Sequence, residues 1–180
     1  MVDYPVSATL HPIIAESCAS IAPASLQIAP VGARRLSDIA RPGMCVTIAF
    51  TDATRACPDE LLIGYLFNEL GALGISASDI TLLCATGLHR PMTAAERIAK
   101  LGVDLAGRAR IVDHRALDPD ALMTLGEIDG LPVVVNRLCV ETNLLIATGV
   151  VEPHQYAGYS GGAKTVVIGC GGEATTGARL

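Results

Sequence analysis

The sequence predicts an α/β fold in which helices flank a mostly parallel, Rossmann-like sheet. Apolar residues make up 51% of the 180 positions, yet tryptophan is absent and there are only two phenylalanines. The core must therefore consist mainly of aliphatic side chains, and continuous aliphatic runs are typical of strands buried on both faces of a parallel sheet. These runs alternate with segments whose capping residues indicate helices, which is the pattern of βαβ units.

An irregular lead-in, residues 1–42, is expected before an α/β domain that covers residues 43–172. The lead-in is rich in Ala, Ser and Pro and has room for one short helix. Residues 173–180 indicate a truncated tail, so we expect an incomplete N-terminal domain whose C-terminal partner domain is missing. No charged segment followed by a long apolar run opens the chain, and no signal peptide is expected.

The first strand is predicted at residues 43–50, and a helix follows it. Pro58 suits the first turn of that helix, where the acidic residues after it favour the positive end of the helix dipole. Gly71 and Gly74 are expected to end the helix. The stripe expected to face the sheet consists of Leu62, Leu66 and Leu70, flanked by Ile63 and Phe67.

The second strand is predicted at residues 79–87. Thr93 and Glu96 form a capping box that starts the next helix, and Gly102 is expected to end it. Three further strands are predicted at residues 109–115, 131–140 and 143–151, with a short helix capped by Asp118 at residues 118–126.

Polar residues follow three of these strands, at the edge where ligands of such folds bind. Asp52 and Arg55 follow the first strand, His89 the second, and His154 with a glycine-rich loop the last. An arginine matches a carboxylate or phosphate, and two histidines can serve as general acid and base. Structural roles are equally open for both residues: Asp52 could be a helix N-cap, and Arg55 could be an ordinary surface arginine. The other two histidines, His11 and His114, lack this context and are expected to be structural or superficial.

Lys164 ends the loop "YSGGAK", and three roles are open for it. Gly158, Lys164 and Thr165 match the spacing of a phosphate-binding loop, but Ala163 replaces its second glycine and the run "TVVIG" is a doubtful helix. A plain turn is the second possibility. The third is an amine for binding or covalent attachment, since a partly desolvated lysine has a lowered pKa and is a nucleophile.

Charge and cysteine content exclude several classes of protein. The net charge is −5 with no basic run, so nucleic acid is not an expected partner. The longest uncharged stretch, residues 18–33, is interrupted by Pro23 and Pro30, so no membrane helix is expected. The six cysteines form no CxxC pair, which argues against a zinc site or a disulfide framework and fits the cytoplasm.

A mean hydropathy of +0.46 indicates an enclosed sheet or an apolar face that another domain or a second copy covers.

Three motifs, "DATRACPD", "TGLHRPMT" and "EPHQYAGYSGGAK", together resemble the N-terminal domain of the lactate racemase family, from about Gly43 to Gly172. The resemblance implies an isomerase acting on small 2-hydroxy acids with a nickel-pincer nucleotide, a pyridinium mononucleotide with thioamide and thiocarboxylate groups. It implies that Lys164 forms the thioamide, in the loop of Ser160, Gly161 and Gly162. It also implies that two histidines, matching His89 and His154, alternate as acid and base. A family arginine that holds the substrate carboxylate matches Arg55, and an aspartate that supports the cofactor or the arginine matches Asp52.

The chemistry that the resemblance implies is proton-coupled hydride transfer. The Cα–H of a 2-hydroxy acid is too weakly acidic for a histidine, whereas loss of the O–H proton with hydride transfer to a pyridinium gives a planar 2-oxo acid. The family's nickel-ligating histidine would fall at Leu180, where there is none, so nickel binding and turnover by this chain alone are not expected. A nucleotide-binding or phosphotransfer domain and a non-catalytic assembly domain remain as alternatives.

Overall fold

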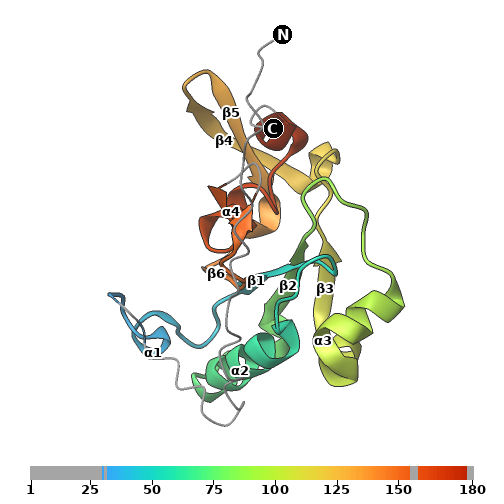
Figure 1. Ribbon diagram of the computed structural model, residues 1–180. Coiled ribbons are helices and arrows are strands. Elements are labelled where there is room, and N and C mark those ends of the chain that lie inside the picture. Colours follow the sequence, from blue (N-terminus) through green and yellow to red (C-terminus); the bar gives the residue numbers. More distant parts are fainter. Residues whose placement is uncertain (1–29, 31, 155–157, 178–180) are drawn as a thin grey trace, which may run out of the picture.

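A computed structural model describes residues 30, 32–154 and 158–177 (Figure 1). Its central sheet has four strands in the order β3-β2-β1-β6, and every neighbouring pair is parallel. The strands are β1 (Val46–Thr51), β2 (Ile80–Ala85), β3 (Arg110–Asp113) and β6 (Leu144–Ala147). The predicted α/β class with a mostly parallel sheet is therefore confirmed.

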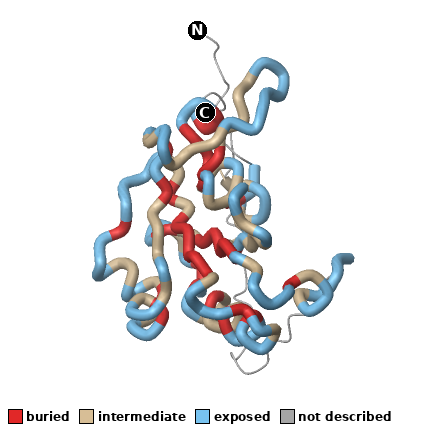
Figure 2. Tube along the Cα trace, turned by 180° about the vertical axis from the view of Figure 1, so that it is seen from behind, coloured by how far each residue is buried: buried red, intermediate tan, exposed pale blue. Residues whose placement is uncertain are grey.

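Both faces of the two central strands are buried, and side chains alternate between them. Ile48 and Phe50 of β1 join one cluster, whereas Ala49, between them, joins a second cluster on the opposite face. In Figure 1, helices α2 (Asp59–Ala72) and α3 (Ala94–Arg108) lie below the strands, and α4 (Ala163–Val167) lies above them. Seen from behind in Figure 2, the buried segments concentrate in these central strands.

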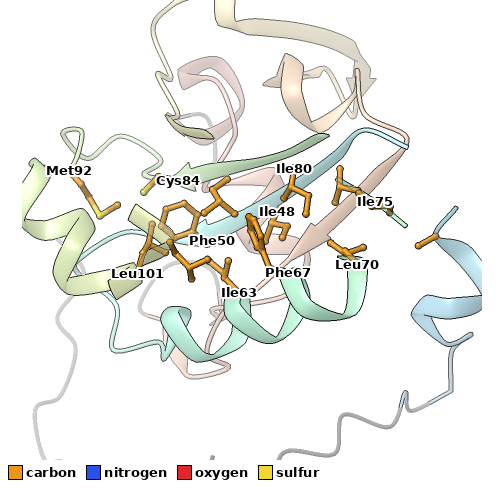
Figure 3. Close-up of a cluster of buried hydrophobic side chains, with 14 residues drawn as sticks. Ile48, Phe50, Ile63, Phe67, Leu70, Ile75, Ile80, Cys84, Met92 and Leu101 are labelled. Atoms are coloured by element: carbon orange, nitrogen blue, oxygen red, sulfur yellow. The ribbon is translucent and has the colours of Figure 1, made fainter. Parts of the chain in front are cut away.

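Helix α2 buries a stripe that differs from the predicted one. Ile63, Phe67 and Leu70 are buried in the core, as Figure 3 illustrates, whereas Leu62 and Leu66 are only partly buried. The prediction placed the stripe one residue too early in its first two turns, because apolar residues occupy several adjacent columns of this helix and spacing alone does not select among them. The predicted end is close to the observed one, since Gly74, with φ of +81°, follows the last helical residue, Ala72, by two positions.

Helix α3 begins at the predicted capping box but does not end at Gly102. Thr93 accepts a hydrogen bond from the Glu96 amide, and the Glu96 carboxylate accepts one from the Thr93 amide. Gly102 instead forms a kink with φ of +75°, beyond which the helix continues to Arg108. The positive φ is the reason for glycine at this position, since other residues rarely adopt it.

The predicted helix at residues 118–126 is wrong, and a hairpin takes its place. Asp118 does cap a turn, but this is a single 3-10 turn, Pro119–Ala121, followed by strand β4 (Leu122–Ile128). β4 pairs antiparallel with β5 (Leu131–Asn136), so the predicted strand at 131–140 is shorter than expected and lies outside the parallel sheet. Asp129 and Gly130, both with positive φ, form the connecting turn; an Asp-Gly pair between apolar runs is a hairpin signal that the helix prediction overlooked.

The last segments of the chain build the site. Strands β7 (Pro153–His154) and β8 (Gly158–Tyr159) form a small antiparallel pair, and α4 follows, so the run that looked a doubtful helix is helical. Where only a tail was predicted, α5 (Glu173–Thr176) packs on β5, and the Thr175 hydroxyl donates to the Pro132 carbonyl at 2.8 Å. The remaining elements are α1 (Leu36–Ile39) in the lead-in and 3-10 turns at Ala77–Asp79 and Arg137–Cys139.

The described cysteines form no disulfide with one another. Cys45, Cys57, Cys84, Cys139 and Cys170 are all free thiols, and Cys18 lies outside the described residues. Within the same residues, no helix combines the length and apolarity that crossing a bilayer would require.

His114 is a structural residue, as predicted, and it links β5 to the segment before α5. Its ring is buried; Nε2–H donates to the Gly171 carbonyl at 2.8 Å, and Nδ1 accepts from the side-chain Nδ2 of Asn136 at 3.1 Å. Both ring nitrogens are therefore satisfied in the neutral form. His11 lies outside the described residues.

Acidification is expected to destabilise the fold through His114. Burial lowers the pKa of His114 in the folded protein. The unfolded chain then binds a proton more readily than the folded one, so stability is full above about pH 6.5, the usual pKa of histidine. It should fall as the pH drops from there towards the lowered folded pKa. Urea unfolding between pH 7.5 and 5 measures this slope, which a His114→Gln variant should lose; an equal slope in both proteins would contradict the assignment.

Candidate functional site

A cavity of about 790 Å³ opens beyond the carboxyl ends of β1 and β2 and beneath the glycine-rich loop. Its wall includes residues that the sequence placed at separate strand ends, and these now share one space: Asp52, Arg55, His89, His154, Ser160, Gly161 and Lys164. Of the predicted site residues, Gly162 alone does not line the cavity; with φ of 54° it instead forms the N-cap of α4, the helix that carries Lys164.

Asp52 links the loop after β1 to the loop after β2. It is buried; Oδ1 accepts hydrogen bonds from the amide and hydroxyl of Thr54, at 3.1 and 2.6 Å, and Oδ2 accepts one from Nδ1–H of His89 at 2.7 Å. Burial alone would raise the pKa of the Asp52 carboxyl, but the hydrogen bonds from Thr54 and His89 outweigh it and hold that pKa below its usual value. Asp52 therefore does not cap α2, and it is a charged partner for His89.

His89 is oriented by this contact. With Nδ1 bound to Asp52, the second ring nitrogen, Nε2, is left for a ligand, and 57% of the side chain is exposed. A carboxylate that fixes the tautomer of an imidazole is the usual arrangement around a histidine that transfers protons.

Arg55 is joined to an acidic residue that the sequence analysis did not select. Its Nη1 donates to Oε1 of Glu152 at 2.8 Å, and the side chains are 29% and 39% exposed. Glu152 stands two residues before His154 in the motif "EPHQYAG"; an acidic residue so close to a candidate histidine was the available signal.

A second missed contact anchors the loop that carries Asp52 and Arg55. Asp59 was expected to complement the dipole of α2, but it is fully buried and lies 2.9 Å from Nζ of Lys100. The hydroxyls of Thr51 and Thr148 also donate to the Asp59 carboxylate, at 2.8 and 3.1 Å. Lys100 in turn donates to the backbone carbonyl of Arg55, so the ion pair ties α3 to the end of β1 and to the site loop.

The glycine-rich loop is held by its own backbone and by Ser160. The Ser160 hydroxyl is buried; it donates to the Val150 carbonyl at 2.7 Å and accepts from the Glu152 amide at 3.1 Å. Gly161 has φ of +77°, and a Cβ there would lie 2.9 Å from the Val150 carbonyl oxygen, so only glycine fits. A role for Ser160 in binding a cofactor stays a prediction.

Burial and neighbouring charges lower the pKa values of both Lys164 and His154. Partial burial, and then the charge of Arg55, lower the pKa of the Lys164 amine, with Asp52 and Glu152 opposing. Desolvation, and then Lys164 and Arg55, lower the pKa of His154, with Glu152 opposing. A lysine with a lowered pKa has a larger fraction of free, nucleophilic amine at neutral pH.

Metal ligands do not gather in the described part of the chain. Across residues 30, 32–154 and 158–177, no three His, Cys, Asp or Glu side chains come together as a metal-binding group. The position expected for the family's nickel ligand, Leu180, lies outside those residues.

Comparison with known proteins assigns the chain to a family. Residues 12–179 match the family described as the lactate racemase N-terminal domain. The chain belongs to this family. The resemblance drawn from the three motifs is thereby confirmed, because the match covers nearly the whole chain.

Two curated lactate racemases are similar to this family member. That of Thermoanaerobacterium thermosaccharolyticum is 36% identical over 141 residues, which is 78% of this chain and 33% of that protein. That of Lactiplantibacillus plantarum is 34% identical over 141 residues, again 78% of this chain and 33% of that protein. The present lactate racemase N-terminal domain thus spans about a third of the length of the curated relatives it matches.

Solved structures agree with this assignment. The lactate racemase apoprotein from Thermoanaerobacterium thermosaccharolyticum superposes with a TM-score of 0.74 at 32% identity, over 82% of this chain and 35% of that chain. A crystal structure of a protein from Thermotoga maritima gives a TM-score of 0.66 at 27% identity, over 76% of this chain and 36% of that one. The fold of the lactate racemase N-terminal domain is therefore shared with relatives of much greater length.

Proposed function

We propose that the chain is the N-terminal domain of a 2-hydroxy-acid racemase or epimerase of the lactate type, in which Lys164 carries a nickel-pincer nucleotide. The observation that carries this proposal is the single cavity shared by Arg55, His89, His154 and Lys164. Membership of the lactate racemase N-terminal domain family supports the reaction class. These four residues come from three separate segments of the chain: the loop after β1, the loop after β2, and the segment from β7 to α4.

Lys164 fits covalent attachment of the cofactor. It lines the cavity, and partial burial lowers the pKa of its amine. The nickel is proposed with the cofactor. When bound, the group supplies an electron-poor pyridinium that can accept a hydride, which no protein side chain can do.

The protein's own residues bind the substrate and move its proton. Arg55 holds the substrate carboxylate, for which a guanidinium is suited by shape and charge. Nε2 of His89, oriented by Asp52, takes the hydroxyl proton when one enantiomer is the substrate. In the reverse reaction, the same nitrogen donates a proton as that enantiomer is formed. His154 does the same for the other enantiomer, and its lowered pKa keeps it in the basic form at neutral pH.

The nucleotide-binding alternative is less well supported by the loop. The amides of Lys164 and Thr165 already donate to the carbonyls of Gly161 and Gly162, at 3.2 and 3.1 Å, so they are not free to bind a phosphate. In addition, α4 is only five residues long, and the strand before the loop belongs to a two-stranded antiparallel pair rather than to the parallel sheet.

Mass spectrometry of the chain produced together with the cofactor pathway tests the proposal. An adduct is expected on Lys164 and is expected to vanish completely in Lys164→Arg, which keeps the charge but lacks the amine. The other lysine of the chain, Lys100, is a built-in control, because its side chain is only 9% exposed and is paired with Asp59. An adduct on Lys100, or nucleotide affinity that depends on Lys164 without any adduct, would count against the racemase assignment.

A further inference from the structure

Arg55 meets an acidic partner that stands outside the cavity. Arg55 lines the cavity wall, whereas Glu152, whose Oε1 accepts from Nη1 of Arg55 at 2.8 Å, does not. Among the described residues this is the single hydrogen bond of the guanidinium, which has five N–H donors in all. The remaining donors make no hydrogen bond within the described part of the chain, and Arg55 lines the cavity that would hold the ligand.

Glu152 is fixed independently of Arg55. Its amide donates to the Ser160 hydroxyl, and its carbonyl accepts from the Ser160 amide at 2.9 Å, so the glycine-rich loop holds its backbone on both sides. The Arg55 backbone is held in turn, because its amide donates to the Asp52 carbonyl and its carbonyl accepts from Lys100. The ion pair thus joins two fixed loops that lie 97 residues apart in the sequence.

We propose that Glu152 is a positioning residue for substrate binding: it holds the Arg55 guanidinium through Nη1, leaving the other N–H groups for the substrate carboxylate. This inference rests on the proposed function. An unrestrained arginine loses considerable rotamer freedom when it binds an anion, and a guanidinium that is already oriented avoids that cost. The charge of Glu152 itself opposes anion binding, so its benefit lies in orientation.

Two substitutions separate orientation from charge. Glu152→Gln removes the charge but keeps an acceptor oxygen, whereas Glu152→Ala removes both. NMR titration of the 180-residue chain with sodium lactate, at constant ionic strength, gives the dissociation constant of each protein. We expect Glu152→Ala to bind lactate about three- to tenfold more weakly, the range for one immobilised side chain, and Glu152→Gln to stay within about twofold of the unsubstituted chain.

A spectroscopic readout tests the orientation directly. The Nη protons of Arg55 should be slowed in rotation and protected from exchange in the unsubstituted chain and in Glu152→Gln, and should lose this protection in Glu152→Ala. Glu127→Ala, at an exposed glutamate in the β4–β5 hairpin, is the matched control and should change neither measurement. Thermal unfolding confirms that each variant is folded.

The titrations distinguish a failure of the Glu152 inference from a failure of the proposed function. Tighter lactate binding in both Glu152 variants would mean that Glu152 competes with the substrate for Arg55, and this would overturn the inference. Unchanged binding in Glu152→Ala, with binding abolished in Arg55→Ala, would also overturn it but would leave the proposed function intact. Lactate binding that survives Arg55→Ala at full strength would remove the carboxylate anchor from the proposed function itself, and the inference with it.

Discussion

Replacing Lys100 by methionine is expected to lower the free energy of unfolding by about 3–5 kcal/mol. The substitution keeps the aliphatic stem but leaves the Asp59 carboxylate, which has no exposed surface, without its cation at 2.9 Å. The hydroxyls of Thr51 and Thr148 remain, and hydrogen bonds alone do not compensate a buried charge. Urea unfolding at pH 7 measures the change.

A double substitution distinguishes the ion pair from general damage. Lys100→Met combined with Asp59→Asn leaves no charge buried and should recover part of the lost stability. Asp104→Ala is the surface control: Asp104 pairs with Arg108 one turn away, and its side chain is 79% exposed, so a change below about 0.5 kcal/mol is expected. Additive effects of the two core substitutions would contradict the proposed coupling.

Under the proposed function, Asp52→Asn is expected to reduce racemisation by a cofactor-loaded, full-length enzyme that carries this domain about a hundredfold or more, the scale of general acid–base catalysis. The amide keeps the size of the carboxylate but neither fixes the tautomer of His89 nor stabilises its positive form. The substitution should act on kcat with little effect on KM, because Asp52 does not contact the substrate in the proposed arrangement.

The tautomer of His89 is the readout that a purely structural role would not change. Long-range ¹H–¹⁵N NMR of the neutral ring should find the proton on Nδ1 in the unsubstituted chain, and a mixture or reversal in Asp52→Asn. Thr54→Val removes a hydroxyl from Oδ1 of Asp52 but leaves the Oδ2 contact to His89, so it should preserve the tautomer. A proton on Nε2 in the unsubstituted chain would remove Asp52 from this role.

The fold was predictable wherever one local pattern decided an element. The aliphatic runs of β1 and β2, the capping box of α3 and the convergence of strand ends needed only sequence spacing, and each is present in the structure. The hairpin β4–β5 was missed because Asp118 and Pro119 start a helix and a 3-10 turn equally well, and the deciding Asp129–Gly130 pair comes ten residues later.

The partners of the site residues were not predictable in the same way. Asp52 with His89 and Arg55 with Glu152 are separated by 37 and 97 positions, and a sequence alone gives no distance between them. Asp59 illustrates the difficulty, because an acidic residue in a first helical turn has a sufficient local explanation. Its burial against Lys100 depends on how α3 packs over α2, which only the folded chain determines.

The wide spacing of the cavity residues has a consequence for the order of events during maturation. Asp52 and Lys164 come from opposite ends of the described chain, and the charges and burial that tune the lysine amine exist only after β1, β2 and α4 have assembled. A nascent or denatured polypeptide has an ordinary, protonated amine at that position. The proposed attachment of a prosthetic group at Lys164 is therefore expected to follow folding, so that only molecules with the native tertiary structure would receive it.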